Sequence, residues 1–177
     1  MATLKDYRDE RIRKLNELRA EGIEPYPAHT NRNTKIGDIL KSFDKYVEQP
    51  VCIAGRIDSI RSFGKLAFVV VEDDSGHMQV VLKDAAAKFT KKLDTGDFLE
   101  AAGTIGKTQT GEISVFCDQP RILTKALRPL PGRDGFTNKE ERLRRRYVDM
   151  AVNPEVRERF IRRSKFWTAT REVLNEH

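Results

Sequence analysis

Four side chains of different chemistry stand in stretches of alternating sequence between residues 50 and 117: Arg56, Phe68, Gln79 and Glu112. An aromatic ring can stack on an unpaired base, which contributes about 1–3 kcal/mol per base. Amide and carboxylate groups can bond the donor and acceptor edges of such a base. A guanidinium can hold a phosphate or a base edge. Together these groups have the chemistry of a site for an unstacked nucleotide.

Strand alternation indicates that the four side chains share one surface. In the segment KLAFVVVEDDSGHMQVVLK (65–83), successive side chains point to opposite faces. One face is uniformly apolar and is expected to line an interior; it consists of Val69, Val71, Met78, Val80 and Leu82. The other face carries Phe68 and Gln79, which lie directly opposite each other if the turn centres on Asp73 and Asp74. Alternation also points Arg56 and Glu112 outward.

A plainer interpretation accounts for the same residues without a ligand. Phe68 could be covered by a neighbouring helix, and Gln79 could simply be solvated. Arg56 could pair with Glu112 across the outer face. The pattern of the hairpin leaves both interpretations open, so the surrounding elements have to be considered.

Two helices are expected before these strands. Residues 4–21 form the first, with an apolar stripe made by Leu4, Tyr7, Ile12, Leu15 and Leu18. Gly22 is typical of a helix end, and the prolines of GIEPYP prevent its continuation. Residues 34–47 form the second, with Thr34 as the expected N-cap. Its apolar stripe is made by Ile36, Ile39, Leu40 and Phe43.

From residue 50 onward the pattern changes to the alternation of strands. Strands are expected at 50–60, 65–72, 77–83, 97–106 and 111–117, and a short helix at 84–93 separates the third from the fourth. Three strands, a helix and two strands is the order of the five-stranded Greek-key barrel called the OB-fold, which binds oligonucleotides and oligosaccharides on one face. The expected fold class is therefore mainly β, with N-terminal helices and a C-terminal helical linker.

The net charge of +6 is distributed unevenly. Residues 50–128 carry eleven basic and ten acidic side chains, whereas residues 138–177 carry eleven basic and seven acidic ones. A basic C-terminal arm favours a polyanionic partner, although a solvated helix face would have the same composition.

Several classes of protein are disfavoured by composition. No apolar run approaches the roughly 20 residues of a membrane span, and the start MATLKDYRDERIRKL has no apolar signal core. The two cysteines, Cys52 and Cys117, are too few for a disulfide scaffold, and no Cys/His cluster indicates a metal site. We therefore expect a cytoplasmic protein with no metal site and no catalytic residues of its own.

The late strand region contains KTQTGEISVFC, followed by LTKALRPLP. These stretches resemble the N-terminal anticodon-binding domain of bacterial-type class II lysyl-tRNA synthetases, and they are the most specific part of the resemblance. KLNELRAEGIEPYP resembles that family's N-terminal helix and turn. ERLRRRYVDMAVNPEVRERFIRRSKF resembles its linker and long interface helix. The resemblance covers residues from about 8 to 176 and implies four segments: an extension (1–48), the OB-fold domain (49–128), a linker (129–153) and the start of the interface helix (154–177).

The resemblance also implies roles for individual residues. Phe68 would stack on the middle uridine of the anticodon, and Gln79 would hydrogen-bond it. Arg56 would contact the anticodon, and Glu112 would lie near the wobble base. Arg61 and Lys65, in the loop after the first strand, would add supporting contacts. The implied partner is a tRNA with a UUU-type lysine anticodon.

The sequence departs from whole enzymes of this family. Motifs two and three, which bind ATP, have no counterpart, and the chain stops at REVLNEH within or just after the helix of motif one. We therefore expect a truncated piece that does not charge tRNA and binds no cofactor. The parent would form lysyl-tRNA with ATP and Mg²⁺ as a homodimer. The stripe Val156, Phe160, Trp167 and Leu174 would leave the last helix either partly disordered or paired with another copy.

Two functions from other classes remain open. A free-standing OB-fold could bind single strands without reading their sequence, with a steep dependence on salt. Alternatively, the first helix or the basic arm could bind another protein. Neither accounts for Phe68, Gln79, Arg56 and Glu112 together.

Overall fold

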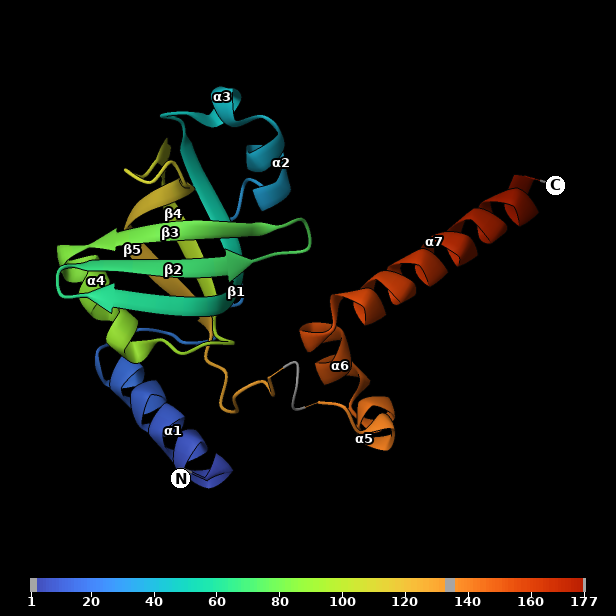
Figure 1. Cartoon of the computed structure of the whole chain (residues 1–177), viewed down its shortest axis with the longest axis horizontal. Coiled ribbons are helices and arrows are strands. Elements are labelled where there is room, and N and C mark those ends of the chain that lie inside the picture. The colour runs from blue at the N-terminus through green and yellow to red at the C-terminus, as the bar shows by residue number, and fades with distance from the viewer. Residues whose placement is uncertain (1–2, 133–135, 177) are drawn as a thin grey trace. The chain divides into compact units, whose positions relative to one another are not determined.

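A computed structural model describes residues 3–132 and 136–176. The chain divides into two compact units, one ending at Pro129 and the other beginning at Leu130. The first unit contains the barrel and the N-terminal helices, and the second contains three helices (Figure 1). Among the described residues, no helix is both long enough and apolar enough to cross a membrane.

Five strands form a closed barrel in the order β1-β2-β3-β5-β4. They are β1 (Pro50–Phe63), β2 (Leu66–Glu72), β3 (His77–Lys83), β4 (Phe98–Lys107) and β5 (Ile113–Thr124). Neighbours are antiparallel except for β3 and β5, which are parallel. The helix α4 (Asp84–Phe89) and the single turn η1 (Thr90–Lys92) connect β3 to β4. This architecture confirms the predicted OB-fold.

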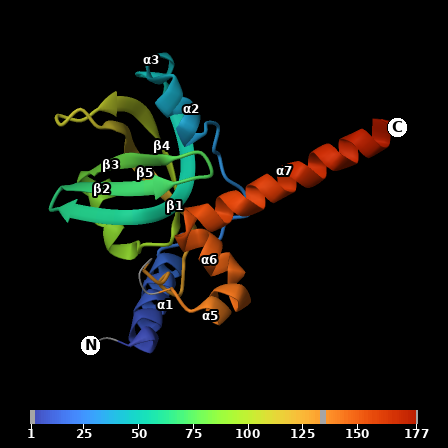
Figure 2. The same cartoon turned by 45° about the vertical axis from the view of Figure 1, so that its right-hand side comes forward.

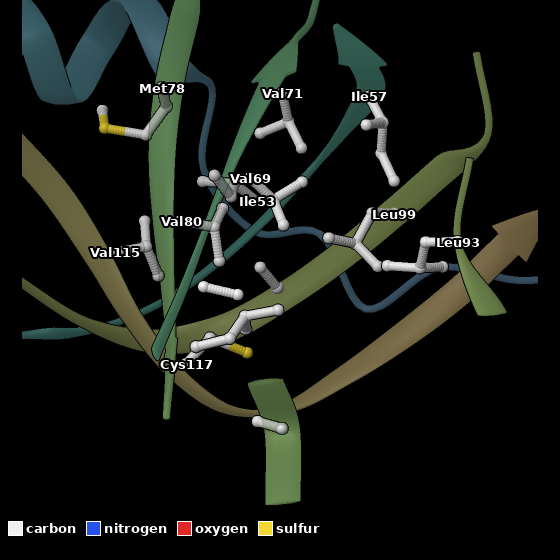
Figure 3. Packing of buried hydrophobic residues seen from close by; sticks show 14 of the residues in the cluster. Ile53, Ile57, Val69, Val71, Met78, Val80, Leu93, Leu99, Val115 and Cys117 are labelled. Carbon is white, nitrogen blue, oxygen red and sulfur yellow. The ribbon is translucent and has the colours of Figure 1, made fainter. Parts of the chain in front are cut away.

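The interior of the barrel is apolar, as alternation predicted. Figure 3 shows side chains from all five strands converging on one core. Val69, Val80 and Leu82 are 0% exposed, and Val71 and Met78 are 1% and 2% exposed. Both cysteines are buried, and burial raises the pKa of the Cys117 thiol to about 11. Burial raises the pKa of Cys52 as well, and so disfavours the thiolate, the nucleophilic form, in both cysteines.

The register of the hairpin differs from the prediction by two residues. Phe68 lies opposite Val81, and Gln79 lies opposite Val70. The cause is the turn: Asp73 Oδ1 accepts hydrogen bonds from the backbone N–H groups of Ser75 (2.7 Å) and Gly76 (3.1 Å), which fixes four residues between the strands. A shift of two residues preserves the face of each side chain. Phe68 and Gln79 therefore still point outward, as diagonal neighbours.

A β-bulge in β1 brings Arg61 onto the outer face. The register shifts between Ile57 and Ser59, and Arg61 then lies opposite Phe68. Without the extra residue, Arg56 and Arg61 would point to opposite faces, because they are an odd number of positions apart. β1 also extends to Phe63, so Arg61 belongs to the strand rather than to the loop in which we expected it.

The N-terminal helices are α1 (Leu4–Ala20), α2 (Ile36–Lys41) and α3 (Phe43–Tyr46). Figures 1 and 2 show α1 at one end of the barrel and α2 and α3 at the other. In α1, Leu15 and Leu18 are buried, whereas Leu4 and Tyr7 are exposed. The predicted stripe of α1 therefore packs only along the second half of the helix.

The prediction that Thr34 is the N-cap of the second helix is wrong. The cap position is Lys35, whose side chain makes no capping bond. Instead, the backbone N–H of Ile36 donates to Asp73 Oδ2 (3.1 Å) and that of Gly37 to Ser75 Oγ (2.8 Å). The turn between β2 and β3 thus caps α2 from a distant part of the chain.

A buried ion cluster joins α1, the segment between η1 and β4, and the residues just after β5. The Lys125 side chain is 0% exposed, and its Nζ donates to Asp97 Oδ2 (2.7 Å) and to Asp94. Lys14 of α1 pairs with the other oxygen of Asp94 at 2.7 Å. Arg11 donates to the carbonyl oxygens of Ala126 (2.8 Å) and Thr95 (3.1 Å). The first helix is therefore fixed to the barrel by directed polar contacts as well as by Leu15 and Leu18.

A second buried carboxylate holds the segment between α1 and α2. Glu100 accepts two hydrogen bonds of 2.8 Å from Arg121, which is a bidentate arrangement. Glu100 Oε2 also accepts from Thr30 Oγ1 (2.7 Å) and from the backbone N–H of Asn31 (2.6 Å). Burial disfavours ionisation of Glu100, but these bonds outweigh it and lower the pKa of the carboxyl.

The second unit consists of α5 (Lys139–Arg144), α6 (Arg146–Val152) and α7 (Pro154–Glu176). Asp149 is buried and accepts bonds from Arg142 (2.9 Å), Arg146 (2.7 Å) and Asn153 (2.7 Å). Along α7 only Val156 of the predicted stripe is buried; Trp167 is 53% and Leu174 72% exposed. Pairing of this helix with another copy stays a prediction.

Candidate nucleic-acid interface

The outer face of the barrel is organised in rows that run across four strands. One row consists of Arg61 (β1), Phe68 (β2), Val81 (β3) and Phe116 (β5). The next row consists of Ser59, Val70, Gln79 and Ser114 in the same strand order. Figures 1 and 2 show β1, β2 and β3 side by side on this part of the barrel. The rows place Phe68 and Gln79 as diagonal neighbours, within reach of long side chains.

The first of these rows, together with Gln79 of the second, lines a hollow of about 570 Å³. Its walls combine aromatic rings, basic groups and neutral polar groups, and no acidic side chain is among its lining residues. They are Arg61, Phe63, Leu66, Phe68, Gln79, Val81, Lys83, Lys107, Thr108, Gln109, Thr110 and Phe116. Aromatic platforms beside basic groups are the usual means by which proteins bind a single strand.

Phe68 is presented to this hollow as a half-buried ring. Its cross-strand neighbour on β3 is Val81, which is 3% exposed. The ring of Phe63 meets it edge-on, with centroids 6.2 Å apart and planes inclined by 70°. Phe63 is itself 65% exposed, so it supports the ring without enclosing it. No helix among the described elements of the first unit lines the hollow, contrary to the interpretation in which a helix covers Phe68.

Gln79 is oriented by a buried hydroxyl. Its Nε2 donates to Ser114 Oγ at 3.0 Å, and Ser114 Oγ donates in turn to the carbonyl oxygen of Glu112 at 3.2 Å. Ser114 is 0% exposed, so its hydroxyl cannot exchange these two hydrogen bonds for bonds to solvent water. The Oε1 atom and the second N–H of Gln79 remain to form an acceptor and donor pair, which can match the edge of a base.

Glu112 lies at a smaller hollow of about 280 Å³ that adjoins the first. Arg61, Gln79 and Thr110 line both hollows. Glu112 is exposed and precedes β5 instead of belonging to it, in a turn closed by the Thr108 N–H bond to the Glu112 carbonyl (2.9 Å). Gly111 has φ of +84°, which suits glycine at this turn. His77 also lines this smaller hollow.

Two of the predicted residues lie away from the hollows. Arg56 is on the outer face, but its guanidinium lies over the ring of Phe98, 5.1 Å from the centroid. Lys65 is in the turn between β1 and β2 and is exposed. Neither residue lines either hollow. The structure thus groups Phe68, Gln79, Arg61 and Glu112 and leaves the other two outside the group.

Several residues that complete the larger hollow were not predicted from the sequence pattern. Phe63 and Lys107 escaped notice because both strands extend further than predicted. Phe116 and Lys83 point outward by simple alternation, and that signal was present in the sequence. Alternation does not reveal that β3 pairs in parallel with β5, and this pairing brings Phe116 next to Val81.

The described residues contain no group of three or more His, Cys, Asp or Glu side chains that could hold a metal ion. The chemistry available on the outer face is recognition, through stacking, hydrogen bonding and charge.

The chain is similar to known proteins over the barrel and beyond it. Residues 51–123 match a family model described as the tRNA anticodon OB-fold nucleic acid binding domain. The lysine–tRNA ligase of Roseiflexus sp. (strain RS-1) is 43% identical over 98% of this chain, and that of Carboxydothermus hydrogenoformans is 44% identical over 94%. The lysine–tRNA ligase of Thermotoga maritima is 36% identical over 97%.

The chain spans only part of these relatives: 37%, 35% and 37% of their respective lengths. The matched family domain coincides with the barrel, from the start of β1 almost to the end of β5. The barrel of this chain is therefore similar to the OB-fold nucleic acid binding domain, and the chain as a whole is similar to a part of lysine–tRNA ligases.

Proposed function

We propose that this chain binds the anticodon loop of a lysine tRNA. The observation that carries the proposal is that Phe68, Gln79 and Arg61 line one hollow on the outer face of an OB-fold barrel. The ring of Phe68 stacks on the middle base of the loop, and Gln79 bonds its edge. Arg61 and Lys107 neutralise the phosphates beside that base. Glu112, at the adjoining hollow, contacts a neighbouring base.

The preferred middle base is uridine. Its edge offers two carbonyl acceptors flanking one N–H donor, and Gln79 retains one acceptor and one donor after its bond to Ser114. A cytidine offers an amino group in place of one carbonyl, which changes the pattern that Gln79 meets. The middle position of a UUU-type anticodon is therefore the position at which this barrel discriminates.

Arg56 and Lys65 have supporting roles at most in this proposal. Arg56 either moves away from the Phe98 ring to reach the RNA or contacts RNA that lies outside the hollow. Lys65 contacts the RNA backbone from the turn between β1 and β2. The whole parent enzyme would form lysyl-tRNA from lysine, ATP and tRNA with Mg²⁺, as a cytoplasmic homodimer. This chain would supply the part that selects the tRNA.

The test is a titration of the chain with RNA hairpins. One hairpin carries a UUU anticodon loop, and the other differs only in its middle base. Wild type should prefer the UUU loop, and Phe68→Ala should lose about 1–3 kcal/mol of binding free energy along with the preference. Phe68→Tyr keeps the ring and should retain both. Tyr46→Ala removes a ring outside both hollows and should behave as wild type.

The salt dependence of the same titrations separates the alternative function. A sequence-tolerant binder of single strands would bind both loops equally and would lose affinity steeply as salt increases. Equal binding that is indifferent to Phe68→Ala would reject anticodon recognition and leave an electrostatic binder.

The relay behind Gln79 gives a second prediction. Ser114→Ala removes the hydroxyl that orients Nε2 of Gln79. The preference for the UUU loop should fall by about 0.5–1.5 kcal/mol, the usual contribution of one such bond, while stacking on Phe68 remains. Binding of a loop with a different middle base should not change. A Ser114→Ala variant with undiminished preference would show that Gln79 needs no fixed orientation.

A further inference from the structure

A second aromatic ring faces the same hollow as Phe68. Phe116 lies in the same row, with the buried Val81 between the two rings. The rings stand on β2 and β5, two strand spacings or about 9.6 Å apart. Aromatic rings in direct contact have centroids about 4.5–7 Å apart. Phe68 and Phe116 therefore leave a gap between them, and each offers its own surface.

The ring of Phe116 packs closely against the backbone of the barrel. It packs against Gly106 of β4, where a Cβ atom would lie 3.0 Å from the ring. Glycine at this position lets the ring lie close to the backbone of β4. On the side of the hollow, the ring meets Lys83, whose Nζ is 5.6 Å from the centroid. Lys83 is exposed and forms no ion pair with the described carboxylates, so its flexible stem can move.

Lys83 stands on β3, the strand between the two rings. Lys83 lies two residues beyond Val81, opposite Leu66, so by strand the order is ring, cation, ring with the cation displaced from the row of the rings. Two successive nucleotides have the matching order of base, phosphate and base. An exposed cation–π contact contributes less than the stacking of a base. A base can thus replace the Lys83 ammonium on Phe116, and the ammonium can move to the phosphate that joins the two nucleotides.

We propose that Phe116 and Lys83 form a second nucleotide position, which takes a base next to the middle base of the loop. The proposal rests on the proposed function, because it assumes that Phe68 holds the middle base. The ligand is two successive unstacked nucleotides with their linking phosphate. Under this proposal the hollow of about 570 Å³ is a site for a dinucleotide rather than for one base.

Two other roles for Phe116 make different predictions. Both rings could hold one base between them, in which case Phe116 and Phe68 depend on the same nucleotide. Alternatively, Phe116 could serve only to cover Gly106, in which case its replacement by another apolar side chain would not affect RNA. Leucine keeps an apolar cover but removes the stacking surface, so Phe116→Leu separates packing from stacking.

The experiment combines protein variants with abasic RNA. The UUU hairpin is prepared intact and with the base removed at the first, the middle or the third anticodon position. Each RNA is titrated with wild type, Phe68→Leu, Phe116→Leu and Tyr46→Leu. Tyr46 is the matched control, because it is a ring with a lysine Nζ at 5.7 Å that lines neither hollow. Thermal unfolding of each variant checks that the fold is retained.

Phe116→Leu should weaken binding of the intact loop about 5- to 150-fold. The same penalty should remain with the middle base absent and should disappear when one particular flanking base is absent. Tyr46→Leu should have no penalty. The proposal is overturned if Phe116→Leu binds the intact loop normally, if its penalty survives every abasic substitution, or if it disappears with the middle base.

The outcome for Phe68 is read separately. Its penalty should disappear only when the middle base is absent. If that fails while Phe116→Leu depends on a single base, the assignment of Phe68 to the middle base is wrong and the proposed function must be revised. If Phe68 behaves as expected and Phe116 does not, anticodon binding stands and the second position is rejected.

Discussion

Replacing Lys125 with alanine is expected to lower the free energy of unfolding by about 3–5 kcal/mol, because it leaves a buried carboxylate without its partner. Lys125 and Asp97 are both 0% exposed, and their Nζ and Oδ2 atoms are 2.7 Å apart. The matched control is Lys35→Ala, which breaks an exposed pair of similar length with Asp74 (2.9 Å). That control should cost less than about 1 kcal/mol. Urea unfolding at pH 7 measures both.

The pH dependence of the Lys125→Ala variant provides a second readout. Burial raises the pKa of Asp97, while the bonds from Lys125 and from the backbone of Ala126 and Asp94 lower it. Removing Lys125 raises this pKa further. The folded variant then takes up a proton more readily than the unfolded chain, so its stability falls as the pH rises. The deficit relative to wild type should therefore be smaller at about pH 5 than at pH 7. An equal deficit at both values would contradict an unpaired charge as the cause.

Glu100→Gln is expected to lower the free energy of unfolding at pH 7 by about 1.5–3 kcal/mol, the range for hydrogen bonds to a charged group. The glutamine loses the bidentate pair with Arg121 and weakens the bonds from Thr30 and Asn31. The matched control is Glu17→Gln, which makes the same substitution in an exposed pair with Arg13. The control should change stability by less than about 1 kcal/mol.

The sign of the pH effect follows from the lowered pKa of Glu100. A carboxyl whose pKa is lower in the folded state stabilises the protein above its unfolded value and loses that contribution as the pH falls through the folded value. The difference between wild type and Glu100→Gln should therefore shrink below about pH 4, near the ordinary pKa of glutamate. Urea unfolding from pH 7 to pH 3 tests this. A difference that stays constant over the range would show that Glu100 acts by shape rather than by charge.

Much of the fold follows from local pattern. The apolar alternation of Val69, Val71, Val80 and Leu82 is strict, so the interior face and the bounds of β3 were predicted correctly. The order of elements was sufficient to indicate an OB-fold. These features depend on residues close in sequence, whose hydrophobic pattern determines which face is buried.

The features that were predicted wrongly depend on contacts between distant residues. The hairpin register is set by the Asp73 side chain, which bonds the turn from within. Thr34 does not cap α2, because the cap position falls on Lys35 and the Thr34 hydroxyl donates to Asn33 Oδ1 (2.8 Å) instead. The capping groups come instead from Asp73 and Ser75, nearly forty residues further along the chain. No local signal in the sequence reveals such a cap.

The sequence predicted the kind of candidate site, but only some of the residues that form it. Phe68 and Gln79 were found because they are the polar and aromatic exceptions on an otherwise ordinary hairpin. The outward direction of Arg61 depends on the bulge between Ile57 and Ser59, which alternation cannot foresee. Phe116 reaches the hollow only through the parallel pairing of β5 with β3.

The parallel pairing of β3 with β5 also bears on how the protein folds. The row from Arg61 to Phe116 joins residues that are far apart in sequence, and such pairings form slowly because a long loop must first close. The hairpin of β2 and β3 can form early and alone, but it carries only part of the row. RNA affinity therefore reports on barrel closure itself: a refolding chain should regain it in the slowest phase, after its local structure has returned.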